Sequence, residues 1–342
     1  MSTISEERWR ALLELSFRFR NLAPWEWMYD SDLFGVRNRN TGEVGYCCIL
    51  GRSGQAPGLA VYKGLEGLHS FEKMQQSDLD TPFPLQVVEQ NCLMLEFGSR
   101  KRLDRREAAR LSQLGFQVRG STRWPVFRDY SPGFAPSEIT TDEEALWLQD
   151  ALEQGLEIAA RIRSNPDLLQ RGQDDNRFVL VRQLSGRDSG VWTDEWTEAP
   201  VYEPAKPPVE VNKLFLRSNS NGLSIRFDSV WVTDTFMLPT PIQAPGRRAE
   251  LPRLLLILDG ASGMVIFHQV FRPGVMEQEL QQRFMRFAQT AGYLPERIVA
   301  PRVEVLGWWE DITKILGIRL ELNRQVRIVD EFVESLFRSM SV

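Results

Sequence analysis

Apolar and polar positions in the first half of the chain predict helices mixed with antiparallel strands. Residues 5–22 carry apolar side chains at mostly helical spacing, and Ser5 is a candidate N-cap. Two apolar runs flank the turn residues 38–42, which indicates a β-hairpin. The other elements are expected as strands at 58–64, 91–99 and 178–184 and as helices at 65–76, 104–114 after the cap Asp104, and 142–163 after Thr140 or Thr141. The pattern predicts an α+β domain with an antiparallel sheet.

The second half alternates strands with helices. Apolar alternation in residues 211–218 and 224–233 predicts two antiparallel strands joined at the turn residues 220–222. The elements that follow are expected in the order strand 253–258, strand 264–271, helix 276–291, strand 297–300, helix 303–316, strand 318–322 and helix 329–338. Such alternation requires crossover connections, so this half is predicted to be an α/β domain with a mixed sheet.

The length of the chain predicts two domains. Its 342 residues exceed the roughly 250–300 at which a single hydrophobic core stops growing. The proline-bearing stretch 203–212 resists both helix and central strand, so it is the best linker candidate. We expect a first domain at 1–200, a linker at 201–210 and a second domain at 211–342. The residues between 185 and 200 are expected to form a polar, Trp-bearing turn region.

Composition and the amino-terminal pattern predict where in the cell the protein is found. Apolar residues make up 42% of the chain and charged residues 25%, which is typical of a folded globular protein. The amino terminus mixes charges into its apolar pattern, so it is not expected to be a signal or transit peptide. No stretch approaches the ~20 apolar residues that span a bilayer. The sequence therefore predicts a cytoplasmic protein without membrane association.

Few residues are suited to metal or nucleophilic chemistry. Cys47, Cys48 and Cys92 are too few for a disulfide framework and are expected as buried, reduced thiols. His69 and His268 are the only histidines, which excludes most metal sites and most Ser-His or Cys-His arrangements. A net charge of −5 and a pI near 5.4 argue against a broad nucleic-acid surface. We expect no metal site and no cofactor.

Short motifs in both halves resemble known families. The first half resembles an uncharacterised bacterial family in Pro24-Trp25-Glu26, Leu59 to Gly64 with Gly67, Leu114-Gly115, Trp124-Pro125, Phe127-Arg128 and Pro132-Gly133. The second half is similar to a domain often found with that family in Leu256 to Asp259, Ser262-Gly263, Pro295 to Ile298 and Gly317-Ile318. The resemblance implies a two-domain protein of unknown function and assigns no catalytic residues.

The element order of the second half also resembles the ribonuclease H and transposase-integrase fold. In that fold the first strand carries an Asp, matched here by Asp259, and an acidic residue ends the strand after the first helix. This chain has Ala300-Pro301-Arg302 at that second place. Metal-dependent phosphoryl transfer needs several carboxylates around magnesium ions. A divergent nuclease would therefore use Mg with Asp259, Glu304 and Glu331, or Asp330 in place of the last. Asp259 equally suits a strand-end turn.

Aromatic and arginine residues gather in two segments of the first half. The candidate binding residues are Trp25, Trp27, Arg123, Trp124, Phe127, Arg128 and Tyr130, with Phe134 close by in the sequence. Trp, Tyr and Arg dominate interface hot spots, so half-exposed side chains would suit partner binding. Fully buried, the same residues would only staple a Pro- and Gly-rich loop onto the domain.

A basic run, Arg100-Lys101-Arg102 with Arg105 and Arg106, opens the helix predicted after Asp104. Cations at a helix start oppose the helix dipole unless anions lie near. Glu96, Asp104 and Glu107 are candidate partners, which favours a solvated face, while a phosphate contact is the alternative.

These patterns give three hypotheses of function. No catalytic constellation is complete, so we expect a non-catalytic binding or interaction protein with a protein partner rather than an enzyme. The alternative is the divergent nuclease that uses Mg. A second alternative is a nucleic-acid-binding module built on the basic run.

Overall fold

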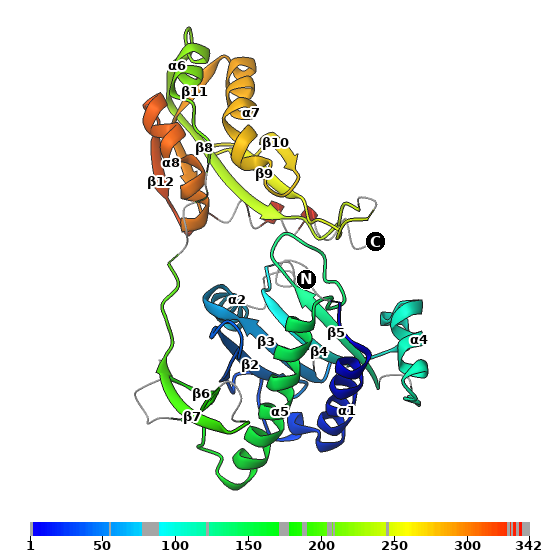
Figure 1. The fold of residues 1–342 in the computed structure, drawn as a ribbon. Helices are drawn as coiled ribbons and strands as arrows, with labels where there is room; N and C mark the ends of the chain where they lie inside the picture. The colour runs from blue at the N-terminus through cyan, green and yellow to red at the C-terminus, as the bar shows by residue number, and fades with distance from the viewer. Residues whose placement is uncertain are drawn as a thin grey trace. The chain divides into compact units, whose positions relative to one another are not determined.

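The computed structural model describes residues 3–54, 56–76, 89–120, 123–170, 178–186, 190–203, 207, 209–243, 246–326, 329, 331–332 and 335–336. The chain folds as two compact units (Figure 1). Unit 1 contains the described residues up to 132 and from 136 to 202, and unit 2 contains residues 133–135 and the described residues from 203 onward. None of the described helices is both long and apolar enough to cross a membrane.

Unit 1 is a sheet flanked by helices. Its elements are α1 (Glu6–Leu22), η1 (Pro24–Glu26), β1 (Phe34–Arg37), β2 (Val44–Leu50), β3 (Gly58–Lys63), α2 (Gly64–Gln76), β4 (Cys92–Gly98), η2 (Arg100–Arg102), α4 (Arg105–Gln113), β5 (Trp124–Tyr130), α5 (Asp142–Ser164), β6 (Phe178–Leu184) and β7 (Trp192–Glu198). The strand order is β5-β4-β3-β2-β1-β6-β7. Every neighbouring pair is antiparallel except β1 with β6. The predicted α+β class is confirmed, with one parallel pair added.

Helix starts in unit 1 follow their capping residues. The Ser5 hydroxyl accepts the Arg8 backbone N–H at 3.1 Å. Asp104 and Thr141 each form a capping box with the Glu three residues later. The predicted starts of α1, α4 and α5 are therefore confirmed, and Thr141 rather than Thr140 caps α5.

The core of unit 1 lies between α1, α5 and one face of the sheet. Apolar side chains of both helices, such as Leu12 and Leu148, are fully buried against alternating strand residues such as Ile49 and Leu93. Figure 1 shows α1 and α5 lying side by side over the strands. The other face of β2 and β3 is covered by α2. Burial of this apolar face is the main stabilising contribution to unit 1.

The predicted turn region after β6 is wrong in part, because residues 192–198 form strand β7. This strand pairs with β6 along its whole length, from Phe178 opposite Glu198 to Leu184 opposite Trp192. Trp192 and Trp196 pack against the core, while the residues between them are exposed. The alternation is short and its outward residues are acidic, so the sequence pattern resembled a polar turn.

Unit 2 is a mixed sheet with helical crossovers. Its elements are α6 (Lys213–Asn219), β8 (Ser224–Met237), β9 (Arg253–Asp259), β10 (Val265–Phe271), α7 (Met276–Ala291), β11 (Tyr293–Ala300), α8 (Val303–Leu316) and β12 (Arg319–Leu322). The strand order is β10-β9-β8-β11-β12. Strand β9 pairs antiparallel with both β8 and β10, whereas β11 pairs parallel with both β8 and β12. The predicted α/β class with a mixed sheet is confirmed.

Two predictions for unit 2 have other outcomes. Residues 213–219 form helix α6 and not a strand, because Asn212 caps the Phe215 N–H at 3.0 Å and Leu216 is buried against the core. The predicted helix 329–338 lies largely outside the described residues, as does Asp330.

The sheet of unit 2 separates two apolar layers. On one face Trp231 contacts Phe284 of α7, and Phe284 contacts Trp309 of α8, with ring centroids 6.0 and 5.0 Å apart. On the other face Val232 and Leu256 lie in a smaller cluster with Val329. The large aromatic side chains place most of the buried volume between the sheet and α7 and α8.

Candidate functional site

Two members of the predicted binding set, Trp25 and Trp27, make internal contacts after α1. The Trp25 ring lies 6.1 Å from Phe19 and 6.0 Å from Phe97, centroid to centroid. The Trp27 indole N–H donates to the Ala159 carbonyl at 3.1 Å. These rings attach the turn at Pro24–Glu26 to the helices and sheet of unit 1, which is the stapling role.

Three members on β5 are also held inside unit 1. Phe127 is buried and meets Trp9 edge-on, with ring centroids 5.7 Å apart. Arg128 forms an ion pair with Glu107 and donates to the Arg102 carbonyl at 2.6 Å. Tyr130 is buried, and this burial raises the pKa of its hydroxyl. The inward contacts of these side chains come from β5 pairing and from α4 packing against it.

The last two members, Arg123 and Trp124, lie at the start of β5 and remain accessible. Arg123 is exposed and Trp124 is half-buried, with its indole N–H bound to the Gly120 carbonyl at 3.1 Å. The Arg100 guanidinium lies 5.7 Å from the centre of the Trp124 ring. Arg20, at the end of α1, donates to the Arg123 carbonyl at 3.1 Å. We call Arg20, Arg100, Arg123 and Trp124 the arginine–tryptophan patch.

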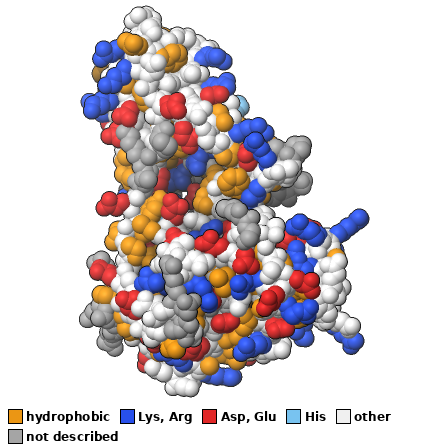
Figure 2. All heavy atoms as spheres, viewed as in Figure 1, with side chains coloured by type: hydrophobic (Ala, Val, Ile, Leu, Met, Phe, Trp, Pro, Cys, Tyr) orange, Lys and Arg blue, Asp and Glu red, His pale blue; other side chains and the backbone are white. Residues whose placement is uncertain are grey.

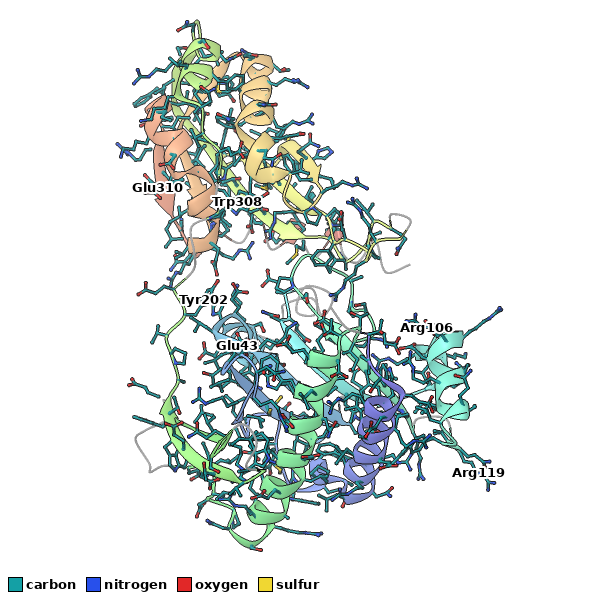
Figure 3. All side chains as sticks on the ribbon, viewed as in Figure 1. Glu43, Arg106, Arg119, Tyr202, Trp308 and Glu310 are labelled. Atoms are coloured by element: carbon teal, nitrogen blue, oxygen red, sulfur yellow. The ribbon has the colours of Figure 1, made fainter. Side chains whose placement is uncertain are left out.

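Positive charge in this patch is not balanced locally. Among the residues that the structure describes, no carboxylate forms an ion pair with Arg20, Arg100 or Arg123. Burial, and then the neighbouring charge of Arg123, lower the pKa of Arg20. In Figure 2, Lys and Arg side chains gather on the side of unit 1 that carries α4. Figure 3 shows Arg119, four residues before Arg123, extending outward.

The basic run 100–106 does not act as one surface. Arg102 forms an ion pair with Glu96, and Arg106 forms one with Glu138 at 2.9 Å. Arg100 turns to Trp124 instead, while Lys101 and Arg105 are exposed. The run is therefore divided between an ion-paired face and the arginine–tryptophan patch.

The charged side chains that line a pocket of unit 1 are all in ion pairs. It is lined by Trp9, Leu13, Leu103, Glu107, Arg110, Leu111, Pro125, Phe127 and Glu138. Its two carboxylates are already paired, Glu107 with Arg128 and Glu138 with Arg110. Arg110 also stacks on Trp9, with its guanidinium carbon 4.0 Å from the ring centre. The pocket is a packed junction of α1, α4 and β5.

The carboxylates of the nuclease hypothesis lie apart in unit 2. Asp259 ends β9 and accepts the Ser262 hydroxyl at 2.7 Å and the Ser262 N–H at 2.8 Å. These bonds lower the pKa of Asp259. Glu304 lies in the first turn of α8, and Glu331 is exposed. No three Asp, Glu, His or Cys side chains in the described part of the chain are grouped to hold a metal ion.

A second acidic residue of unit 2, Asp234, lies on the central strand of the sheet, β8. Strand β8 comes before β9 in the chain, so β8 rather than β9 is the first strand of this sheet. Asp234 is buried, accepts the Thr235 N–H at 2.6 Å and forms an ion pair with Arg302 at 2.6 Å. The predicted strand 224–233 ended one residue before Asp234, so this pair was not among the predicted site residues.

The two histidines also have ordinary environments. His268 is exposed on β10, and His69 on α2 is stacked on Tyr202, with ring centroids 3.9 Å apart. All three cysteines are free and buried, and burial raises the pKa of each thiol. The three thiols are therefore not accessible as nucleophiles in the folded protein.

Comparison with known proteins matches the two halves of the chain to two domain families. A family model described as a domain of unknown function (DUF6930) matches residues 224–337, within unit 2. Neither the curated proteins nor the solved structures that were compared give a match. A second model, also described as a domain of unknown function (DUF7309), matches residues 9–182, which is half of the 342-residue chain. The chain therefore belongs to the DUF7309 family of domains of unknown function.

Proposed function

We propose that this protein is a non-catalytic binding protein whose arginine–tryptophan patch recognises an acidic segment of a protein partner. The observation that carries the proposal is the uncompensated charge of the patch. Arg20 and Arg123 lie close enough to repel, and no described carboxylate pairs with either. A carboxylate supplied by a partner would relieve this repulsion and pair with guanidinium groups already held in place.

Trp124 gives the patch an apolar centre. Its ring is half-buried and its N–H is satisfied internally by Gly120, so its position is fixed before any partner arrives. A fixed ring loses little conformational entropy on binding. Trp and Arg are also the residue types that dominate interface hot spots. The four residues together supply a small, charged and rigid recognition surface.

Contacts in unit 2 support a non-catalytic role. Arg302 follows the strand at which the ribonuclease H resemblance places an acidic residue, and it pairs with Asp234. A guanidinium bound to this carboxylate occupies the place where a magnesium ion would need negative charge. Asp259 is engaged by Ser262 in a turn. The nuclease hypothesis therefore requires both carboxylates to leave their present partners.

A protein partner is favoured over nucleic acid by the charge of the chain. The patch holds three arginines on a chain whose net charge is −5. A nucleic-acid surface neutralises many phosphates along a track, whereas an acidic peptide needs only a few pairs. The buried free thiols of Cys47, Cys48 and Cys92 agree with the reducing cytoplasm as the compartment.

Charge reversal at Arg123 separates binding from stapling. In Arg123→Glu the new carboxylate lies beside Arg20, so we expect the free energy of unfolding to stay constant or rise slightly. Binding of an acidic partner should fall at least about tenfold, since an attractive charge becomes repulsive. Trp124→Ala should weaken binding in the same direction. Trp25→Phe is the control, because the Trp25 ring packs against Phe19 and Phe97 inside unit 1.

The measurement is photo-crosslinking in the native host, with the photoreactive residue at exposed Arg119, next to the Gly120 that accepts the Trp124 N–H. We expect one discrete protein adduct by mass spectrometry, and its loss in Arg123→Glu. The same reagent at exposed Glu195, on β7, is the positional control. An adduct that survives Arg123→Glu, or equal labelling from Glu195, would contradict the proposal. An adduct removed by nuclease treatment would favour the nucleic-acid alternative.

The enzyme alternative has its own test. Purified protein is incubated with Mg²⁺ and labelled DNA or RNA, alongside the variants Asp234→Asn and Asp259→Asn. We expect no cleavage above background in any sample. Cleavage that depends on Mg²⁺ and disappears in Asp234→Asn would overturn the non-catalytic assignment.

A further inference from the structure

Strand β10 forms one edge of the sheet in unit 2. Figure 1 shows it as the outer strand next to β9, and within the described residues it pairs with β9 alone. His268 is exposed and Val270 is 44% exposed. An edge strand leaves a row of backbone groups free, and such a row is a template for another strand. A binding partner at this edge would therefore be another β-strand that pairs through its backbone N–H and C=O groups.

The outward-facing groups of β10 can be identified from the β9–β10 hairpin. The Asp259 N–H donates to the carbonyl of the residue before β10 at 2.9 Å, so Asp259 turns its backbone toward β10. Backbone directions alternate along a strand, so Leu255 does the same and its partner Gln269 faces back toward β9. His268 and Val270, on either side of Gln269, therefore turn their N–H and C=O groups outward.

Charge distinguishes β10 from the other sheet edges. Strand β5 carries an Arg and an Asp, β7 carries three acidic residues, and β12 carries an Arg and a Glu. Asp129 of β5 also exchanges backbone bonds of 2.8 and 3.2 Å with Ser137. By contrast, β10 contains no Asp, Glu, Lys, Arg or Pro. Edge charges and prolines keep strands apart, and β10 has none of these devices.

We infer that β10 pairs antiparallel with β10 of a second copy of this chain, about a two-fold axis at Gln269. This register places His268 opposite the partner copy's Val270 and Val270 opposite the partner copy's His268. Each of these pairs exchanges two N–H···O bonds. The strand is uncharged, so two identical copies meet without repulsion, whereas β7 would place acidic residues against acidic residues.

Side chains support the same register. Gln269 lies at the axis, and its amide now donates to the Val270 carbonyl at 3.0 Å, which shows that this carbonyl can accept from outside the ladder. In the dimer the Val270 carbonyl accepts instead the backbone N–H of His268 from the second copy. A contact of one strand buries little surface, so the dimer is expected to be weak and to exchange with monomer.

A disulfide trap tests the register without destabilising the fold. Directly opposite residues in a pair without mutual hydrogen bonds have Cβ atoms about 4.5–5.5 Å apart, close to the geometry of a disulfide. Gln269→Cys should therefore form a disulfide-linked dimer under mild oxidation. His268→Cys is the control and should not, because its opposite residue is Val270. The native cysteines are buried, so the background is low.

Oligomeric state gives the second readout. Sedimentation velocity of the full chain should show a monomer–dimer equilibrium, and Val270→Pro should weaken it at least about tenfold by removing an outward N–H. Val270→Thr keeps this N–H and should dimerise normally. A wild-type chain that stays monomeric, or a dimer unaffected by Val270→Pro and untrapped by Gln269→Cys, overturns the inference. A trap by His268→Cys alone overturns the register.

Discussion

Both units pack helices on their sheets through apolar side chains, but they differ in the contacts that are added to this packing. In unit 1, α5 reaches the β1–β6–β7 end of the sheet through ion pairs, in which Asp150 binds Arg39 at 2.8 Å and Glu157 binds Arg182 at 2.8 Å. In unit 2, α7 and α8 meet the sheet through Phe284, Trp309 and Trp231. Strand β7 is half exposed, and beside the packing of Trp192 and Trp196 it adds the ion pair of Asp194 with Arg161 of α5.

Substitutions should therefore destabilise the two units for different physical reasons. Truncating a buried aromatic side chain lowers the unfolding free energy in proportion to the volume removed. Removing one partner of a buried ion pair lowers it because the other partner is left as an unpaired, buried charge. Substitutions in the two units should therefore differ in size and in dependence on pH. Each unit is best followed separately, because a single unfolding free energy is not defined for two units that unfold independently.

The largest effect is expected from Trp309→Ala in unit 2. Trp309 is fully buried, and among the described residues its indole N–H has no hydrogen-bond partner, so its contribution is packing alone. Truncation should cost about 3–5 kcal/mol of unfolding free energy. Hydrogen exchange of unit 2 peptides measures it. Trp309→Phe should cost much less, and equal costs for both variants would show that packing volume is not what matters.

Arg39→Ala in unit 1 comes next, at about 3 kcal/mol near neutral pH. Asp150 has no exposed side-chain surface, and burial raises its pKa even with Arg39 present. Removing Arg39 raises that pKa further. A carboxyl whose folded pKa lies above its unfolded value destabilises at higher pH, so the cost should shrink as pH falls and Asp150 takes up a proton.

The thiols provide the measurement for Arg39→Ala. Cys47, Cys48 and Cys92 all lie on strands of unit 1, and their buried thiols react only when that unit opens. Labelling should accelerate in Arg39→Ala at pH 7 and less so in acid. Arg37→Ala, on the same hairpin but with a half-exposed partner in Glu195, is the control and should change stability by less than about 1 kcal/mol. A pH-independent cost would contradict the assignment to Asp150.

Arg302→Ala in unit 2 should cost less than Arg39→Ala, about 1–3 kcal/mol. Asp234 keeps the Thr235 N–H when Arg302 is removed, so its carboxylate is not left without a partner. Hydrogen exchange of unit 2 peptides reports the change. A cost larger than that of Arg39→Ala would mean that the pair in unit 2 is the more deeply buried of the two.

Local signals made much of the fold predictable. Capping residues such as Ser5 and Thr141 and the hairpin at 38–42 depend on near neighbours in sequence, so α1, α5 and the β1–β2 pair were found. Helix α6 was missed because seven residues carry little periodicity and its stability comes from Leu216 in the core. Tertiary burial decided that segment, and sequence propensity did not.

The candidate site was less predictable because its parts are distant in sequence. Trp124 and Arg123 were identified by their residue types, but Arg20 lies 103 residues before Arg123 and carries no local signal. The pair of Asp234 and Arg302 spans 68 residues, and no local sequence signal links the two. Only packing shows which carboxylates already have partners.

The smallest predicted effect concerns acid stability at β7 in unit 1. Hydrogen bonds from Arg161, and then from Arg182, lower the pKa of Asp194. A carboxyl with a lowered folded pKa stabilises above its unfolded pKa, and this contribution is lost as pH falls through the folded value. Asp194→Asn should therefore cost less than about 1 kcal/mol at pH 7, since the pair is partly exposed, and should flatten the acid dependence of β7. Hydrogen exchange of peptides over 192–198 measures this, with intrinsic exchange rates corrected at each pH. An unchanged acid dependence in the variant would place the pH-sensitive group elsewhere, and Asp194 would then contribute nothing to the pH response of the ion pairs between α5 and the sheet.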